Sequence, residues 1–90
     1  MKTLDQIGSF KRDLKRVTKR GYDLSKLARV LSLLKASAPL PVSHRPHSLR
    51  GRWKGFLECH VEPDWLLIYP TDAVRVLLVR TGTYADLFDE

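Results

Sequence analysis

Apolar residues near the start of the chain recur at helical spacing. They are Ile7, Phe10, Leu14 and Val17. Because neighbours in this set are three or four positions apart, they fall on one face of a helix. Ser9 is a suitable N-cap for this helix, and Gly21 is a suitable residue at its end. The pattern therefore predicts a short amphipathic helix that ends before Gly21.

A second apolar pattern follows Asp23, which is another good N-cap. Its members are Leu24, Leu27, Ala28, Leu31 and Leu34. We expect the two helices to form an antiparallel helical hairpin over residues 1–37, with their apolar faces packed on a sheet. A short strand at residues 2–4 would precede the hairpin.

The second half of the chain is predicted to form the sheet. Prolines end helical structure within residues 38–50, which read as a proline-rich loop. The pattern then changes to period two, in the runs WKGFLECHV, DWLLIYP and AVRVLLVRT. We expect three antiparallel strands in a meander, with AVRVLLVR as the central strand because it is apolar on both faces. The final segment, TYADLFDE, forms one helical turn or docks on the sheet. The fold class is thus α+β, in a single domain whose sheet and tail occupy residues 51–90.

Charge separates the two halves. The chain carries 16 Lys and Arg against 10 Asp and Glu, a formal net charge of +6, and ten of these basic residues lie in the first 35 positions. Those expected on the outer face of the helices are Lys11, Arg12, Lys15, Arg16, Lys19 and Arg20. Such a run is typical of a solvated helix face. It also suits a surface that follows a nucleic-acid backbone or receives an acidic partner.

Cysteine content and hydropathy limit the cellular setting. A single cysteine, Cys59, excludes an internal disulfide, and the first residues lack the apolar core of a signal peptide. We therefore expect a cytoplasmic protein, since no apolar stretch approaches the ~20 residues that span a bilayer. A zinc site with His44, His47, Cys59 and His60 as candidate ligands is an alternative. It is disfavoured because Cys59 and His60 are neighbours on a strand and point to opposite faces.

Several residues of the second half suit metal-free cleavage of RNA. Attack by the RNA's own 2′-hydroxyl needs one group to remove a proton, one to protonate the leaving 5′-oxygen, and cationic donors for the phosphate. Histidine suits the first two roles and arginine the third. The turn after WKGFLECHV places His60 and Asp64 near one end of the sheet, and Arg80 returns to that end.

Aromatic residues add a binding argument. Trp65 and Phe88 flank the proposed cleft and are candidates for stacking against a base. Trp53 and Tyr69 are assigned to packing instead.

The run HSLRGRWKGFLECHVEPDWLLIY, with RTGTYADLF, closely resembles the YafQ branch of the RelE/ParE toxin superfamily. The HVEPDWLLIY and RTGT segments are the most specific part of the likeness, which covers nearly the whole chain. The resemblance implies a fold like that of microbial ribonucleases and the activity of a ribosome-dependent mRNA endonuclease from a type II toxin–antitoxin system. It implies cleavage in the ribosomal A site, at adenine-rich lysine codons in related toxins. The products would be a 2′,3′-cyclic phosphate and a 5′-hydroxyl, with no metal or other cofactor.

The resemblance also carries over individual positions. The candidates for catalysis are His47, His60, Asp64, Arg80 and Tyr84, and those for substrate binding are Trp65, Phe88, Arg50 and Lys54. Related toxins commonly have a histidine where this chain has Tyr84, and a phenol is a poorer general base than an imidazole at neutral pH. His47 and Asp64 then become the candidates for proton transfer, His60 and Arg80 hold the phosphate, and Tyr84 is an auxiliary donor. Which group is acid and which is base stays open.

The implied partners are macromolecular. The six basic helix residues named above would contact 16S ribosomal RNA, and the cleft would receive mRNA. The free toxin would be monomeric, and an antitoxin resembling DinJ or RelB would bind it to form a hetero-oligomer. No membrane partner is expected. Two alternatives remain. One is a ParE-like or catalytically degenerate toxin that acts by binding protein, with Tyr84 as the sign of lost nuclease function. The other is a non-catalytic basic RNA-binding module.

Overall fold

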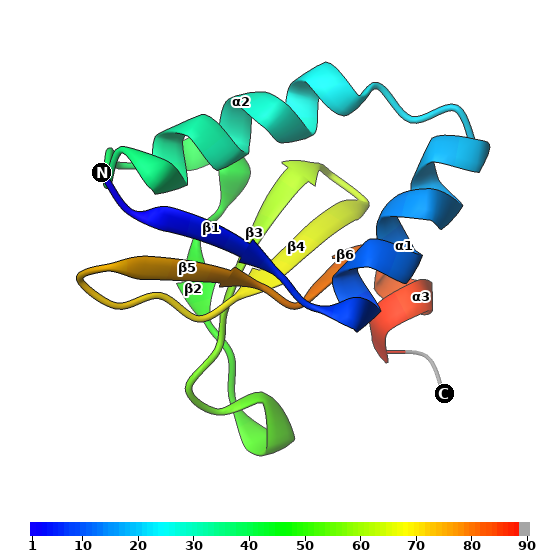
Figure 1. Ribbon diagram of the computed structural model, residues 1–90. Helices are drawn as coiled ribbons and strands as arrows, with labels where there is room; N and C mark the ends of the chain where they lie inside the picture. The colour runs from blue at the N-terminus through cyan, green and yellow to red at the C-terminus, as the bar shows by residue number, and fades with distance from the viewer. Residues whose placement is uncertain (89–90) are drawn as a thin grey trace.

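The fold is built around one buried strand, β4 (Trp65–Tyr69), all of whose residues are buried in the computed structural model. β4 lies inside a four-stranded antiparallel sheet of order β2-β3-β4-β6. The other strands of this sheet are β2 (His47–Ser48), β3 (Leu57–Glu62) and β6 (Arg80–Gly82). A second, parallel sheet pairs β1 (Thr3–Gln6) with β5 (Arg75–Leu78), as Figure 1 shows. The structure describes residues 1–88, so the last two residues of the predicted C-terminal tail lie outside the described residues.

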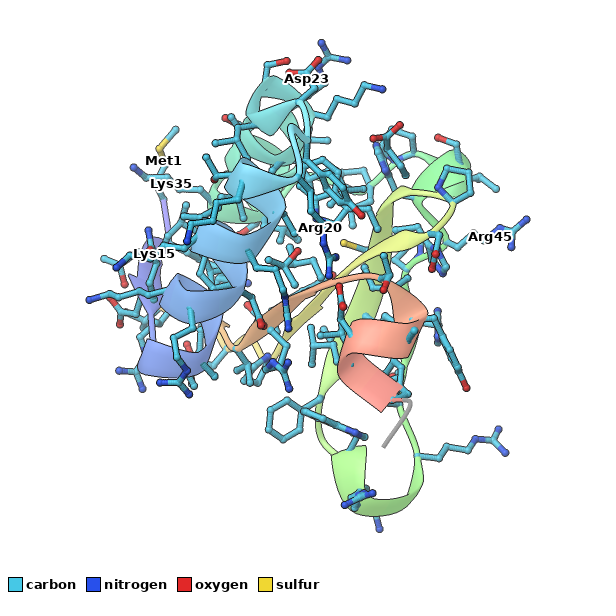
Figure 2. All side chains as sticks on the ribbon, turned by 90° about the vertical axis from the view of Figure 1, so that its right-hand side faces the viewer. Met1, Lys15, Arg20, Asp23, Lys35 and Arg45 are labelled. Atoms are coloured by element: carbon cyan, nitrogen blue, oxygen red, sulfur yellow. The ribbon has the colours of Figure 1, made fainter. Side chains whose placement is uncertain are left out.

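Within residues 1–88, three α-helices accompany the sheets, which confirms the α+β class. They are α1 (Gly8–Lys19), α2 (Leu24–Lys35) and α3 (Tyr84–Phe88). α1 packs chiefly on β6, whereas α2 packs on β1, β3 and β5. The hairpin of α1 and α2 is open: in Figures 1 and 2 the two helices run in different directions from their shared turn, so each covers a separate part of the sheets. Among residues 1–88, no helix has the length and apolar character needed to cross a membrane.

The ends of the helices follow the sequence in most respects. The Asp23 side chain accepts a hydrogen bond from the Ser25 amide at 3.0 Å, which confirms it as the N-cap of α2. Gly21 has a φ of 82°, a left-handed conformation that suits glycine and ends α1. The prediction of Ser9 as N-cap is wrong, because Ile7 holds that position without a side-chain cap. Ser9 Oγ instead donates to the Val79 carbonyl at 2.6 Å and ties α1 to the sheet.

The prediction of AVRVLLVR as one central strand is also wrong. The run divides at Val79 into β5 and β6, and β4 occupies the centre. The Val79 amide still donates to the Ile68 carbonyl at 3.0 Å, so the chain stays beside β4 as β5 turns to pair with β1. The predicted N-terminal strand is present as β1. The proline-rich segment is more ordered than expected, since it contains a 3-10 turn, Val42–His44, and the whole of β2.

The two faces of β4 pack against different clusters. Trp65, Leu67 and Tyr69 belong to the main core, with apolar residues of α1 and α2. Leu66 and Ile68 point the other way, into a smaller cluster. Its other members are Leu87, Leu49, Trp53, Phe56 and Phe88. Tyr69 and Trp53 thus have the packing roles expected of them, on opposite faces of the sheet.

Candidate active site

Three titratable side chains meet on the sheet face that carries the smaller cluster. Residues directly opposite each other in an antiparallel pair project to the same face. His60 lies opposite Leu66, and Glu58 lies opposite Ile68. His47 on β2 in turn lies opposite Glu58. The pairing therefore brings His47, Glu58 and His60 to one face, away from α1 and α2.

The Glu58 carboxylate is at the centre of this group. Glu58 is only 6% exposed, and its Oε1 lies 3.0 Å from His47 Nε2 and 3.9 Å from His60 Nε2. The two imidazole rings have centroids 6.4 Å apart. Glu58 was not among the predicted site residues. Its spacing of two from His60 on a strand was the signal that could have identified it.

Backbone carbonyls fix the hydrogen atoms on both rings. His47 Nδ1 lies 2.8 Å from the Arg45 carbonyl oxygen, and His60 Nδ1 lies 2.9 Å from that of Pro63. A carbonyl oxygen only accepts, so each Nδ1 carries the proton. His47 also faces the Glu58 carboxylate through Nε2, and only the imidazolium form donates to both acceptors. Neutral His60 would instead keep a lone pair on Nε2, because 3.9 Å is too long for a hydrogen bond to Glu58.

Arg80 lies on an edge strand of the sheet, and its guanidinium is bound by a carboxylate of α1. It lies opposite Ile68 on β6. Its Nε donates to Asp13 Oδ2 at 2.6 Å, and its Nη2 donates to Asp13 Oδ1 at 3.2 Å. Asp13, 4% exposed on α1, also accepts from the Thr81 amide at 3.0 Å and from Arg16 Nη2 at 2.6 Å. Asp13 therefore sets the orientation of the Arg80 guanidinium, a role that the sequence did not indicate.

Asp64 and Tyr84 are joined through the backbone. Asp64 Oδ1 accepts from the Tyr84 amide at 2.9 Å, so this carboxylate holds the first residue of α3. The Tyr84 side chain is 64% exposed, and its ring centroid lies 5.0 Å from that of Phe88. Phe88 also makes an edge contact with Trp53 at 6.0 Å. Tyr84 and Phe88 thus form an aromatic pair beside the smaller cluster.

Trp65, predicted to stack against a base, does not lie on this face in the structure. It is 1% exposed within the main core. Its Nε1 donates to Thr81 Oγ1 at 2.9 Å, and its ring meets Tyr22 edge-on at 4.9 Å. Trp65 was expected in the cleft because it follows Asp64 in the turn. The period of two instead turns Trp65 toward the helices.

The predicted basic residues divide by their partners. Lys11, Arg12, Lys15 and Lys19 are exposed on α1, and Figure 2 shows Lys15 pointing away from the sheet. Arg16 and Arg20 are half-exposed and hold carboxylates on the inner side, those of Asp13 and Asp86. Arg50 and Lys54 are exposed beside the 3-10 turn Gly51–Trp53.

The alternative zinc site does not form as proposed. Cys59 is buried in the main core, on the face opposite His60, and burial raises the pKa of its thiol to about 12. His44 Nδ1 donates to the His60 carbonyl at 2.6 Å. Within residues 1–88, no group of three or more His, Cys, Asp and Glu side chains is arranged to hold a metal ion.

Comparisons with known proteins identify the family of the chain. The chain is 41% identical over 86 residues to the mRNA interferase toxin YafQ of Escherichia coli K12, and the match covers 94% of each chain. Its structure is similar to that of YafQ in the E. coli DinJ–YafQ complex, with a TM-score of 0.89, 39% identity and coverage of 98% and 99% of the two chains. It is also similar to a metal-bound toxin from Helicobacter pylori, with a TM-score of 0.91, 38% identity and coverage of 98% and 100%. The family model for YafQ, a bacterial toxin of type II toxin–antitoxin systems, matches residues 2–89. The chain therefore belongs to the YafQ family of bacterial toxins from type II toxin–antitoxin systems.

Proposed function

We propose that this toxin is a ribosome-dependent endoribonuclease that cleaves mRNA in the A site and so stops translation. The observation that carries the proposal is the group formed by His47, Glu58 and His60 on one sheet face. Such a group can take up and release protons around a single phosphate. The 41% identity to a protein named as an mRNA interferase toxin supports the same reaction class.

The hydrogen bonds suggest how the work is divided. We assign the general base to His60, whose Nδ1–H is held by the Pro63 carbonyl, so that Nε2 keeps the lone pair that can accept a proton. His47, paired with the Glu58 carboxylate, is the general acid that protonates the leaving 5′-oxygen. Arg80, held by Asp13, supplies positive charge to the phosphate. Attack by the 2′-hydroxyl then gives a 2′,3′-cyclic phosphate and a 5′-hydroxyl.

This division differs from the sequence-based one at two positions. Asp64 moves from proton transfer to support of α3, because its Oδ1 already accepts from the Tyr84 amide. His60 moves from phosphate binding to proton transfer. Tyr84 and Phe88 stay as groups that contact the RNA, with the exposed phenol as an auxiliary donor.

Exposed basic residues support binding of this toxin to the ribosome. We assign Lys11, Arg12, Lys15 and Lys19 to 16S ribosomal RNA, since they form one charged side of α1. Arg50 and Lys54 would hold the mRNA backbone near the site. The same surfaces suit an acidic antitoxin like DinJ, the partner of the E. coli toxin in its complex. Binding at these surfaces would weaken steeply as the salt concentration rises.

The test is cleavage of a reporter mRNA in a reconstituted translation system, read by primer extension. We expect discrete cuts at A-site codons that depend on ribosomes, and fragments that end in a 2′,3′-cyclic phosphate. His60→Ala and His47→Ala should each lower the rate by about 100-fold or more. If induction of the chain in bacteria arrests growth but no cuts are found, the chain is instead a toxin that binds protein. Unchanged toxicity of both variants would indicate a non-catalytic RNA-binding module.

A further inference from the structure

α3 is too short to hold its own position. It has five residues, and an isolated helix of that length is unstable in water. Yet it carries Tyr84 and Phe88, the two aromatic residues beside the site. Their placement must therefore come from contacts that α3 makes with the rest of the molecule.

One carboxylate gathers most of these contacts. Asp86 Oδ2 accepts from the Thr83 amide at 2.9 Å, and Thr83 Oγ1 accepts from the Asp86 amide at 3.1 Å, which forms a reciprocal cap at the start of α3. Asp86 also sits close over Gly82, where an added Cβ would lie 2.8 Å from Asp86 Oδ2. The first turn of α3 is thus packed tightly on the end of β6.

The same carboxylate is held by α1 through Arg20. Arg20 Nη1 donates to Asp86 Oδ2 at 2.6 Å, and Nη2 donates to Asp86 Oδ1 at 2.9 Å. This two-point geometry fixes direction as well as distance. Figure 2 shows Arg20 in the space between α1 and α3, whereas Lys15 points away. Asp13, Arg16 and Arg20 are spaced by three and four residues, so this inner side of α1 contacts both Arg80 and α3.

We propose that Arg20 and Asp86 are positioning residues, which clamp α3 to the end of α1 and hold Tyr84 and Phe88 against the RNA in the site. The inference rests on the proposed nuclease function. It gives Arg20 an inward role in place of the contact with ribosomal RNA expected from the charge pattern. The hydrogen bond from Arg20 is the main reason that the pKa of the Asp86 carboxyl is lowered. The carboxyl therefore stays charged at neutral pH, as the clamp requires.

The test compares Arg20→Gln and Asp86→Asn with the parent in steady-state cleavage. Each variant should lower kcat by about 10-fold with little change in KM, because misplaced contact groups cost rate. The rate of Arg20→Lys should fall between those of the parent and Arg20→Gln, since an ammonium keeps the charge but cannot make the paired contact. The matched control is Arg75→Gln. It breaks an exposed ion pair, at 3.5 Å, between Arg75 on β5 and Asp5 on β1, and it should leave kcat unchanged.

A double-variant cycle separates positioning from other roles. In a Tyr84→Ala, Phe88→Ala background, Arg20→Gln should cost less than about 2-fold, because the groups that it positions are gone. An equal loss in both backgrounds would overturn the inference. A rise in KM alone would also overturn it and return Arg20 to RNA binding.

A readout without catalysis keeps the two proposals apart. Hydrogen exchange at the Tyr84 and Leu87 amides, which donate to Asp64 and to the Thr83 carbonyl, should quicken in Arg20→Gln but not in Arg75→Gln. If the parent protein makes no cuts, the proposed function fails while exchange still decides the clamp. If the parent cuts and Arg20→Gln matches it in rate and exchange, the clamp is wrong.

Discussion

The two faces of the central sheet are built from the same strands but have different contents. On the face toward α1 and α2, Trp65, Leu67 and Tyr69 form a continuous apolar layer. On the other face, Leu66 and Ile68 form a narrow apolar floor, and His47 and His60 lie beside it with the buried carboxylate of Glu58. One face therefore provides stability, and the other leaves titratable groups near solvent. In so small a domain, β4 has to serve both faces.

The largest expected effect concerns the packed face. Trp65→Ala should lower the free energy of unfolding by about 3–5 kcal/mol, because it empties the space of a fully buried indole. Trp65→Phe should cost about 1–2 kcal/mol, chiefly through the lost bond to Thr81, and should cleave RNA at the parent's rate. Urea unfolding followed by circular dichroism measures the first effect, and primer extension measures the second.

Phe88→Ala is the matched variant on the other face. It should lower the cleavage rate while costing less stability than Trp65→Ala, since Phe88 is only partly buried. Loss of cleavage in a folded Trp65→Phe protein would contradict the division between the faces and return Trp65 to the RNA.

The next effect concerns the carboxylate on the open face. Glu58→Gln keeps the size of the side chain and removes the charge that faces His47, so the cleavage rate should fall by about 100-fold. Single-turnover kinetics measure this loss. Glu62→Gln on the same strand is the control, because Glu62 forms a surface pair with Lys26 at 2.9 Å. Equal rates for Glu58→Gln and the parent would remove Glu58 from the mechanism.

Much of the fold could be predicted from local sequence patterns. The helical spacing of apolar residues gave both helices, and Asp23 was identified as a cap from its residue type and place. The turn between β3 and β4 followed from Glu62-Pro63-Asp64. The strand break at Val79 was not predictable in this way, because both parts of that run are apolar and only pairing with β1 separates them.

The site was harder to read, for a related reason. β4 is apolar on both faces, so the alternation within it does not say which face is open. Trp65 was misplaced for that reason. Asp13 was missed because its main partner, Arg80, is 67 residues away in the sequence. Contacts of that length arise from the assembled fold and leave no local pattern.

The smallest expected effect is on the stability contributed by Asp86, which joins α3 to Arg20 at the end of α1. Arg20 lowers the pKa of this carboxyl in the folded state, so Asp86 stabilises the fold above its unfolded pKa of about 3.8 and less as pH falls toward the folded value. The melting temperature of Asp86→Asn should therefore lie below that of the parent at pH 7, and this gap should begin to narrow at about pH 3, with most of the loss at still lower pH, where the folded carboxyl takes up its proton. Asp5→Asn, in the looser pair with Arg75, should show a smaller gap at pH 7. Thermal melts of the three proteins at both pH values decide the matter. A constant gap for Asp86→Asn would mean that its cap on Thr83, which does not need the charge, holds α3 without help from Arg20.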